Sequence, residues 1–285
     1  MLTTVSAGPV SVRGISVGGI YTALQVPELG VLLDAGAAPR SFAGPDRLFL
    51  SHGHADHAGS LASLLGVRAL VGKTKPLRVH LPAEIESDVE DAVAAASRLQ
   101  GHKLGIRPVP MNPGDEAPVG SGLCARAFRT HHPVPSLGYA FVRRVKKLRP
   151  AYSGLSGGEI RERRRRGEDA LLFAVEERTE LAYATDTLVG VLDREPALYK
   201  ARVLIIECTF LDERKPPRVA RAGCHIHLDE ILDRASHFDN EAIVLMHFSQ
   251  TYKPAEVHEI LARRCPAPLR DRVVAFAPGA GDWPG

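Results

Sequence analysis

The 285-residue sequence lacks any run of 18 apolar residues, so a membrane-spanning helix is not expected. The amino-terminal stretch Met1–Ser6 lacks the basic start and the apolar run of a secretory signal, so we expect a cytoplasmic protein. The four cysteines (Cys124, Cys208, Cys224 and Cys265) form no Cys-x-x-Cys pair, which argues against a zinc ribbon or a redox motif. We interpret them as isolated, buried thiols.

No internal repeat and no linker-like segment divides the chain. Apolar residues make up 45% and charged residues 24%, which is ordinary for a globular α/β domain with a sizeable core. The net charge is +3, but it is unevenly distributed. The segment Arg143–Arg166 holds ten basic and two acidic residues, a net +8, which leaves −5 for the remainder. A basic patch on a mildly acidic body suggests an anionic partner.

Short strand-like runs recur along the chain, and helix-like stretches separate some of them. The helix-like stretches are Ala58–Leu65, Ala83–Arg98, Leu228–His237 and Pro254–Arg264. The strand-like runs are Ile15–Val26, Gly30–Asp34, Arg47–Ser51, Arg126–His131, Leu137–Val142, Leu171–Val175, Leu181–Asp186, Val203–Thr209, Ala242–His247 and Val273–Ala277. This arrangement predicts two sheets covered on the outside by helices, with loop-rich segments at Pro108–Pro118 and Pro266–Gly285.

Polar side chains follow several predicted strands directly. His52, Asp186 and His247 come at the carboxyl ends of three of the runs. Strand ends hold side chains rigidly while the following loops open a cleft above them, so these residues are expected to converge on one site.

Residues 51–60 read Ser-His-Gly-His-Ala-Asp-His-Ala-Gly-Ser. His52, His54, Asp56 and His57 therefore place three imidazoles and a carboxylate within six positions. Imidazole and carboxylate are the ligands that zinc and similar divalent ions prefer. The alternative is a polar surface loop, which does not explain why all four residues follow a strand end. We interpret the segment as a metal-binding loop.

This His-x-His-x-Asp-His motif resembles the signature of the metallo-β-lactamase superfamily. The resemblance implies a single-domain αββα sandwich with one or two metal ions at its edge. It also implies that Asp34, in Leu32-Leu33-Asp34, braces the metal loop. The motif is specific for the fold but not for the reaction, because the superfamily includes many hydrolases.

Three later segments resemble ribonuclease Z, the family of tRNA 3′-end endonucleases. They are His131–Tyr139, Ala184–Thr187 and Met246–Tyr252. The resemblance implies two divalent ions, with zinc the best fit and manganese or iron as alternatives. It assigns one ion to His52, His54 and His132, and the other to Asp56, His57 and His247, with Asp186 bridging the two.

Two more segments resemble the part of ribonuclease Z that acts on the scissile phosphate. Glu207-Cys208-Thr209-Phe210 and Cys224–Glu230 imply that Glu207 and His225 act together, with Asp56 as a third catalytic residue. Spacing back from His247 favours His225 over His227, although the register stays open. The alternatives are that Glu207 is a structural ion-pair partner and that His227 belongs to a helix N-terminus.

The basic segment at about residues 143–170 resembles the substrate arm of the shorter members of that family, without the long Gly- and Pro-rich arm of many others. It predicts phosphate contacts with strongly salt-dependent binding. The candidate substrate-binding residues are Lys146, Lys147, Arg163, Arg164, Arg165 and Arg166. The alternative is a solvated, arginine-rich helix face.

Together these features predict a ribonuclease Z-like, metal-dependent phosphodiesterase that removes the 3′ trailer from precursor tRNA. One alternative is another hydrolase of the same fold acting on a small phosphodiester or ester; a second is a metal-poor RNA-binding module. Precursor tRNA is the expected partner, no membrane is involved, and the resemblance implies a homodimer.

Overall fold

The computed structural model describes residues 2–120 and 122–284 and contains two seven-stranded sheets. The first sheet follows chain order, from the antiparallel β1–β4 to the parallel β5–β7. Its strands are β1 Thr3–Ala7, β2 Val10–Val17, β3 Tyr21–Val26, β4 Val31–Leu33, β5 Arg47–Phe49, β6 Leu77–Pro82 and β7 Ile106–Met111.

The second sheet has the order β14-β13-β12-β11-β10-β9-β8. Its parallel half comprises β11 to β14 and its antiparallel half β8 to β11. Its strands are β8 Glu116–Gly120, β9 Leu123–Arg129, β10 Leu137–Leu148, β11 Phe173–Tyr183, β12 Val203–Glu207, β13 Ala242–Met246 and β14 Val273–Ala275.

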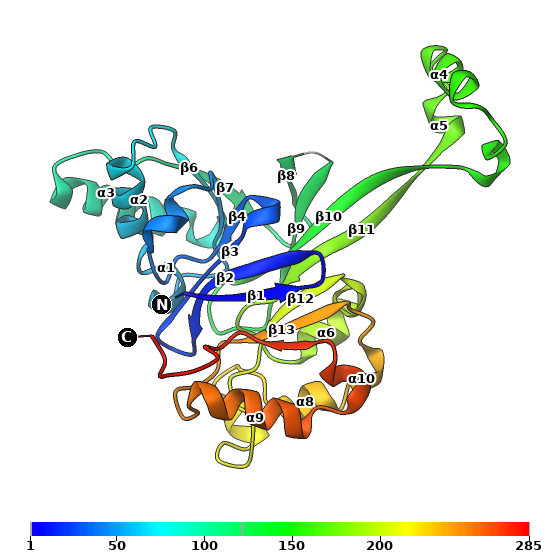
Figure 1. Ribbon diagram of the computed structural model, residues 1–285. Helices are drawn as coiled ribbons and strands as arrows, with labels where there is room; N and C mark the ends of the chain where they lie inside the picture. The colour runs from blue at the N-terminus through cyan, green and yellow to red at the C-terminus, as the bar shows by residue number, and fades with distance from the viewer. Residues whose placement is uncertain (1, 121, 285) are drawn as a thin grey trace.

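Helices cover the outer face of each sheet and leave the inner faces to pack together (Figure 1). On the first sheet they are α1 Ala55–Ala58, α2 Leu61–Leu70 and α3 Glu86–Gln100. On the second they are α6 Gly190–Arg194, α7 Pro217–Ala222, α8 Leu228–Leu232, α9 Pro254–Arg264 and α10 Ala267–Arg270. No helix among the described residues is long and apolar enough to span a bilayer.

Successive side chains of one strand point to opposite faces of the sheet and so join different layers of the core. In β12, Val203 and Ile205 join the core between the sheets, whereas Leu204 and Ile206 join the core under the helices. A strand apolar on both faces must be covered on both sides. The αββα sandwich predicted from the sequence is therefore confirmed.

Several predicted boundaries were wrong. The run Ile15–Val26 is two strands, β2 and β3, because the chain turns at Gly18-Gly19-Ile20 and Gly19 has φ 73°. The segment Pro108–Pro118, predicted to be loop-rich, is a loop only at residues 112–115 and otherwise belongs to β7 and β8. Both are edge strands, where proline removes no ladder hydrogen bond on the free side.

A long two-stranded arm leaves the body of the molecule (Figure 1). It consists of the outer parts of β10 and β11, residues 143–179, with the helices α4 Gly157–Arg165 and α5 Asp169–Leu172 at its tip. The predicted runs Leu171–Val175 and Leu181–Asp186 thus correspond largely to one strand, β11. Where the arm meets the body, the register shifts at Phe141/Val142, and Glu180 is the extra residue of a bulge.

The bulge residue Glu180 is buried and anchors the arm. Its carboxylate accepts hydrogen bonds from Arg143 at 3.1 Å, Arg178 at 2.7 Å and Arg202 at 3.0 Å. The first two arginines belong to the strands of the arm and the third to the body. A buried carboxylate needs such partners, so this cluster fixes where the arm begins.

Candidate metal centre and active site

Three histidines bring their ring nitrogens together beside the end of β5. The Nδ1 atom of His54 lies 3.2 Å from Nε2 of His52 and 3.1 Å from Nε2 of His132. Burial, with His57 nearby, lowers the pKa of His52 to about 2, and burial lowers the pKa of His132 to about 4. Both imidazoles are therefore neutral, which is the form that binds a metal ion.

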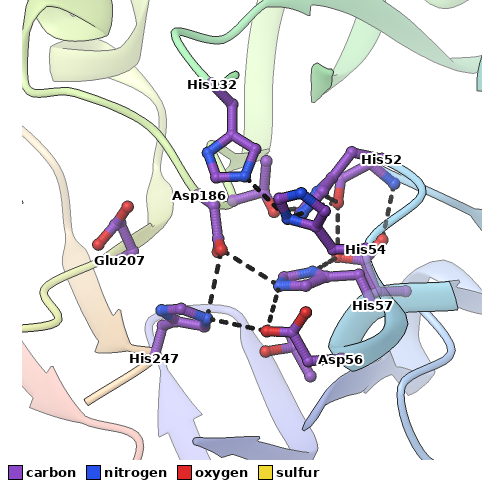
Figure 2. Close-up of polar contacts among 12 residues, drawn as sticks. His52, His54, Asp56, His57, His132, Asp186, Glu207 and His247 are labelled. Carbon is purple, nitrogen blue, oxygen red and sulfur yellow. Dashed lines mark hydrogen bonds and ion pairs between the residues drawn. The ribbon is translucent and has the colours of Figure 1, made fainter. Parts of the chain in front are cut away.

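A second cluster lies next to the first (Figure 2). Asp186 places Oδ2 3.3 Å from Nε2 of both His57 and His247. Asp56 places its own Oδ2 3.6 Å from the same two nitrogens. The structure thus brings together all seven residues that the sequence suggested as ligands, in one group of three and one of four.

The second cluster has the properties of a cation site. Nε2 of His57, Nε2 of His247 and Oδ1 of Asp186 are buried and lack a hydrogen-bond partner among the described residues. Such atoms are costly to bury unless something satisfies them. Burial opposes protonation of His57, yet Asp186 and Asp34 raise its pKa well above the usual value. Positive charge is favoured there, and the nitrogen and oxygen donors fit divalent metal ions.

Asp34 orients His57 from behind. It is fully buried, and its Oδ2 accepts a hydrogen bond from Nδ1 of His57 at 2.7 Å. Ser51 donates to Asp34 through its backbone at 2.6 Å and its hydroxyl at 2.8 Å, and Tyr183 donates at 2.5 Å. In the neutral imidazole this bond keeps the proton on Nδ1, so Nε2 would offer its lone pair to a bound ion.

Two hydroxyl groups orient other histidines through hydrogen bonds to their Nδ1 atoms. Nδ1 of His52 donates to the Ser51 hydroxyl at 2.9 Å, and Nδ1 of His247 donates to the Thr209 hydroxyl at 3.1 Å. Thr209 in turn donates to Glu207 at 2.6 Å. Sequence reasoning missed Ser51 and Thr209 as functional residues, because a hydroxyl residue beside a strand end carries no metal-ligand signal.

Glu207 joins the second cluster to His225. Its buried carboxylate accepts from Nδ1 of His225 at 3.0 Å and from the backbone of Thr187 at 2.8 Å and Ile226 at 3.1 Å, besides Thr209. Both oxygens are thus already used, so Glu207 braces the site rather than offering a ligand atom.

His225 lies at the edge of the cluster, with its ring centroid 5.2 Å from that of His247. Burial disfavours the charged imidazole, but Glu207 outweighs it and raises the pKa of His225 to about 9. The Glu207–His225 pair therefore presents a protonated imidazole beside the ligand groups.

His227 has a different surrounding. It is buried and caps the N-terminus of α8, with Nδ1 accepting from the backbone of Asp229 at 3.1 Å. Its Nε2 donates to the carbonyl of Asp212, also at 3.1 Å. Both ring nitrogens hold the fold, so the structure places His225, and not His227, at the cluster.

The six candidate substrate-binding residues lie on the arm and not at the metal cluster (Figure 1). Many are paired with acidic residues at the tip or on the returning strand. The arm together with its anchoring residue Glu180, residues 143–180, has eleven basic and seven acidic residues, a net +4 rather than the +8 of residues 143–166. The pairs are Lys146–Asp169 at 2.5 Å, Lys147–Glu176 at 2.5 Å, Arg163–Glu168 at 3.7 Å, Arg164–Asp169 at 2.9 Å and Arg166–Glu162 at 2.5 Å.

Glycine allows the metal loop to pack closely. A Cβ atom on Gly36 would lie 1.8 Å from the carbonyl oxygen of Asp56, so no side chain fits there. The backbone of the neighbouring Ala35 donates to the carbonyl of His57, at 2.6 Å. Segments that are 20 residues apart in sequence are thereby held together at the site.

The sandwich and its histidine-rich edge agree with the family comparison. A model described as the β-lactamase superfamily domain matches residues 29–248, and the chain belongs to this superfamily. Among solved structures, YhfI of Bacillus subtilis, a metallo-β-lactamase fold protein, has a TM-score of 0.58 at 14% identity, covering 98% of this chain and 96% of that one. That likeness supports the fold alone.

Relatives with higher sequence identity show which family within the superfamily the chain belongs to. The chain is 35% identical over 270 residues to "tRNase Z TRZ1" of Arabidopsis thaliana, covering 94% of this chain and 95% of the relative. It is 32% identical over 258 residues to "tRNase Z TRZ2, chloroplastic" of the same plant, covering 89% and 71%. Within the superfamily, the chain belongs to the tRNase Z, or ribonuclease Z, family. The resemblance drawn from the sequence motifs is thus confirmed.

The structural neighbours include a member of the same family. The short form of human tRNase Z has a TM-score of 0.56 at 17% identity, covering 99% of this chain and 95% of that one. At this identity the match again supports the fold and not the individual side chains.

Asp34→Asn tests the brace behind His57. Asparagine tolerates the φ of 58° at this position, so the backbone is kept, but the carboxylate that His57 needs is lost. We expect metal affinity to fall by about 10- to 100-fold, as for other residues that orient ligands. Competition with a chelator of known affinity measures this loss. Unchanged affinity in a folded variant would contradict the assigned role.

Proposed function

We propose that this protein is a metal-dependent endoribonuclease that removes the 3′ trailer from precursor tRNA. The cut leaves a 3′-hydroxyl on the tRNA and a 5′-phosphate on the trailer. The observation that carries the proposal is the Glu207–His225 pair beside the two ligand groups, in a chain 35% identical to a tRNase Z along 94% of its length. This pair supplies what the cleavage needs beyond metal binding, which is a proton for the departing oxygen.

His52, His54 and His132 would hold one divalent ion, and Asp56, His57 and His247 the other, with Asp186 between them. We propose zinc, with manganese or iron as the alternatives for such donors. When bound, the ions would activate a water molecule and neutralise charge on the phosphate.

The chain's own residues would move the protons. Burial raises the pKa of Asp56, but His247 and His57 outweigh it and bring the pKa to about 2, so Asp56 is ionised. We assign to this carboxylate the role of accepting the proton of the attacking water. The water oxygen forms a bond to phosphorus while the bond from phosphorus to the 3′-oxygen breaks. His225 donates its proton to that oxygen, and Glu207 stabilises the charged imidazole beforehand.

The direct test compares two substrates with the purified, metal-loaded protein. Precursor tRNA should be cut once, at the 3′ end of the mature sequence, as sequencing of the products would show. Cleavage of bis-p-nitrophenyl phosphate without cleavage of precursor tRNA would reject the proposal and favour a small-phosphodiester hydrolase.

We further propose that the arm grips the tRNA through Lys146, Lys147 and the run Arg163–Arg166. Its support is the projection of the arm from the body and its net positive charge. The homodimer implied by the family and the cytoplasmic location stay predictions, and one relative is named as chloroplastic and another as nuclear.

Changing Arg163, Arg164, Arg165 and Arg166 together to alanine should weaken tRNA binding and flatten its salt dependence. Each phosphate that the protein no longer neutralises lowers the log–log salt slope by about 0.9 for a duplex or about 0.7 for a single strand. Filter binding over a salt series measures this slope. Hydrolysis of bis-p-nitrophenyl phosphate should be retained, because no ligand residue is touched. Normal processing of precursor tRNA at physiological salt would show that the run is only a solvated surface.

A further inference from the structure

Three arginines form a row across the first sheet. Arg47 of β5 is in register with Arg78 of β6, and Arg78 is in register with Arg107 of β7. Adjacent strands lie about 4.8 Å apart, and side chains at one register share a face. Three arginine side chains therefore start from neighbouring positions on one face, in what we call the arginine row, and Arg78 is close enough to Arg47 to lower its pKa. Like charges placed next to one another in a sheet are destabilising.

The arginine row lies at the foot of the arm. Phe49 of β5 packs against Phe141 of β10, with ring centroids 5.0 Å apart. The metal cluster lies beyond Ser51, where β10 begins. Each strand reaches an arginine two residues further from the metal cluster. In β5 this is Arg47, two positions before Phe49, and in β10 it is Arg143, two positions after Phe141 and the first residue of the arm. The row and the arm thus share the end of the sandwich opposite the metal cluster.

The arginine row has little compensating charge within the described part of the chain: burial and the neighbouring Arg78 lower the pKa of Arg47, and Asp46 acts against them. Among the described residues, no hydrogen bond or ion pair of the Arg47, Arg78 or Arg107 side chains occurs, and Nε of Arg47 is buried without a partner. The acid next in sequence, Asp46, is already held by Arg68 at 3.0 Å and Lys73 at 3.5 Å. The arginines of the arm root are different, because they pair with Glu180.

We propose that the arginine row is a second RNA-binding surface, which contacts the phosphate backbone of the tRNA at the foot of the arm. This inference rests on the proposed function. Phosphate oxygens would supply the negative charge that the row lacks, and the planar guanidinium group binds them in a bidentate manner. Contacts of this kind position an RNA without reading its sequence. The arginine row would thus extend the RNA-binding surface from the arm onto the body of the protein.

The test uses the double variant Arg78→Gln/Arg107→Gln and mature tRNA as the probe. Arg47 is left unchanged because its Nε atom is buried. At about 0.1 M salt we expect roughly three- to tenfold weaker binding, as exposed ion pairs of modest strength predict. The log–log salt slope should fall by about 0.7 to 0.9 for each phosphate that the variant no longer neutralises. Hydrolysis of bis-p-nitrophenyl phosphate should not change.

The matched control is Arg98→Gln/Arg263→Gln, which removes the same charge from two exposed arginines on α3 and α9. It should bind tRNA more tightly than the test variant. Thermal unfolding at low salt adds a second readout, since relief of repulsion should leave the test variant at least as stable as the wild type. A marked loss of stability would mean that the row is structural and would overturn the inference.

Equal tRNA affinity and equal salt slope in the test and control variants would also overturn the inference. The arginines would then serve only to keep the exposed edge strand β7 from pairing with other chains. A wild-type protein that does not bind tRNA at all would overturn the inference as well. A wild type that binds tRNA through the row but leaves precursor tRNA uncut would reject the proposed function and keep this surface.

Discussion

Replacing His54 by alanine is expected to remove metal and activity together. His54 contributes the Nδ1 atom that lies within 3.2 Å of both other nitrogens of the first group, so its loss leaves that group with two donors. Elemental analysis should show a fall from about two ions per chain towards one, as a two-ion site predicts. Cleavage of precursor tRNA and of bis-p-nitrophenyl phosphate should both be lost.

His102→Ala is the matched control, because His102 is an exposed histidine outside both ligand groups. It should keep wild-type metal content and activity. Full activity of the wild type in strong chelator, with no metal detected, would reject the metal-dependent mechanism.

His225→Ala is expected to separate chemistry from metal binding. His225 donates to Glu207 and lies beside the ligand groups without belonging to either of the two proposed ion sites. The variant should keep both ions and bind tRNA with wild-type affinity, but its single-turnover cleavage rate should fall by about 10²- to 10⁴-fold, the range for a general acid.

His227 supplies the comparison within the same segment. His227→Asn keeps a side-chain acceptor at the N-cap of α8, so it should cost some stability but little cleavage rate. If His227→Asn slows cleavage more than His225→Ala does, the two histidines have exchanged roles and the proposed proton donor is wrong.

The layered fold and the metal loop could be predicted because their signals are local. His52, His54, Asp56 and His57 lie within six positions, so no knowledge of distant contacts is needed to connect them. Strand β12 is apolar at every position up to Glu207, which by itself indicates a strand buried on both faces. Later ligands such as His132 could be found only through family motifs.

Other features depend on pairings that the sequence does not display. Prolines 108 and 110 indicate a loop unless β7 is known to be an edge strand. The +8 charge of residues 143–166 is partly offset by acids on the returning strand, which become neighbours only when β10 and β11 pair. Arg47 and Arg107 are 60 positions apart, and only the register of three parallel strands places them in one row.

The way the arm is attached lets its reach change independently of the rest of the protein. None of the described residues between Arg143 and Glu180 belongs to the three hydrophobic cores. Inserting or deleting one residue in each strand of the ribbon would lengthen or shorten the arm by about 3.4 Å while keeping the two strands in register. An insertion or deletion in only one strand would instead shift the register of the two strands between that position and the tip of the arm. Insertions and deletions in natural arms should therefore occur in pairs, one residue in each strand, while the length of the catalytic body stays constant.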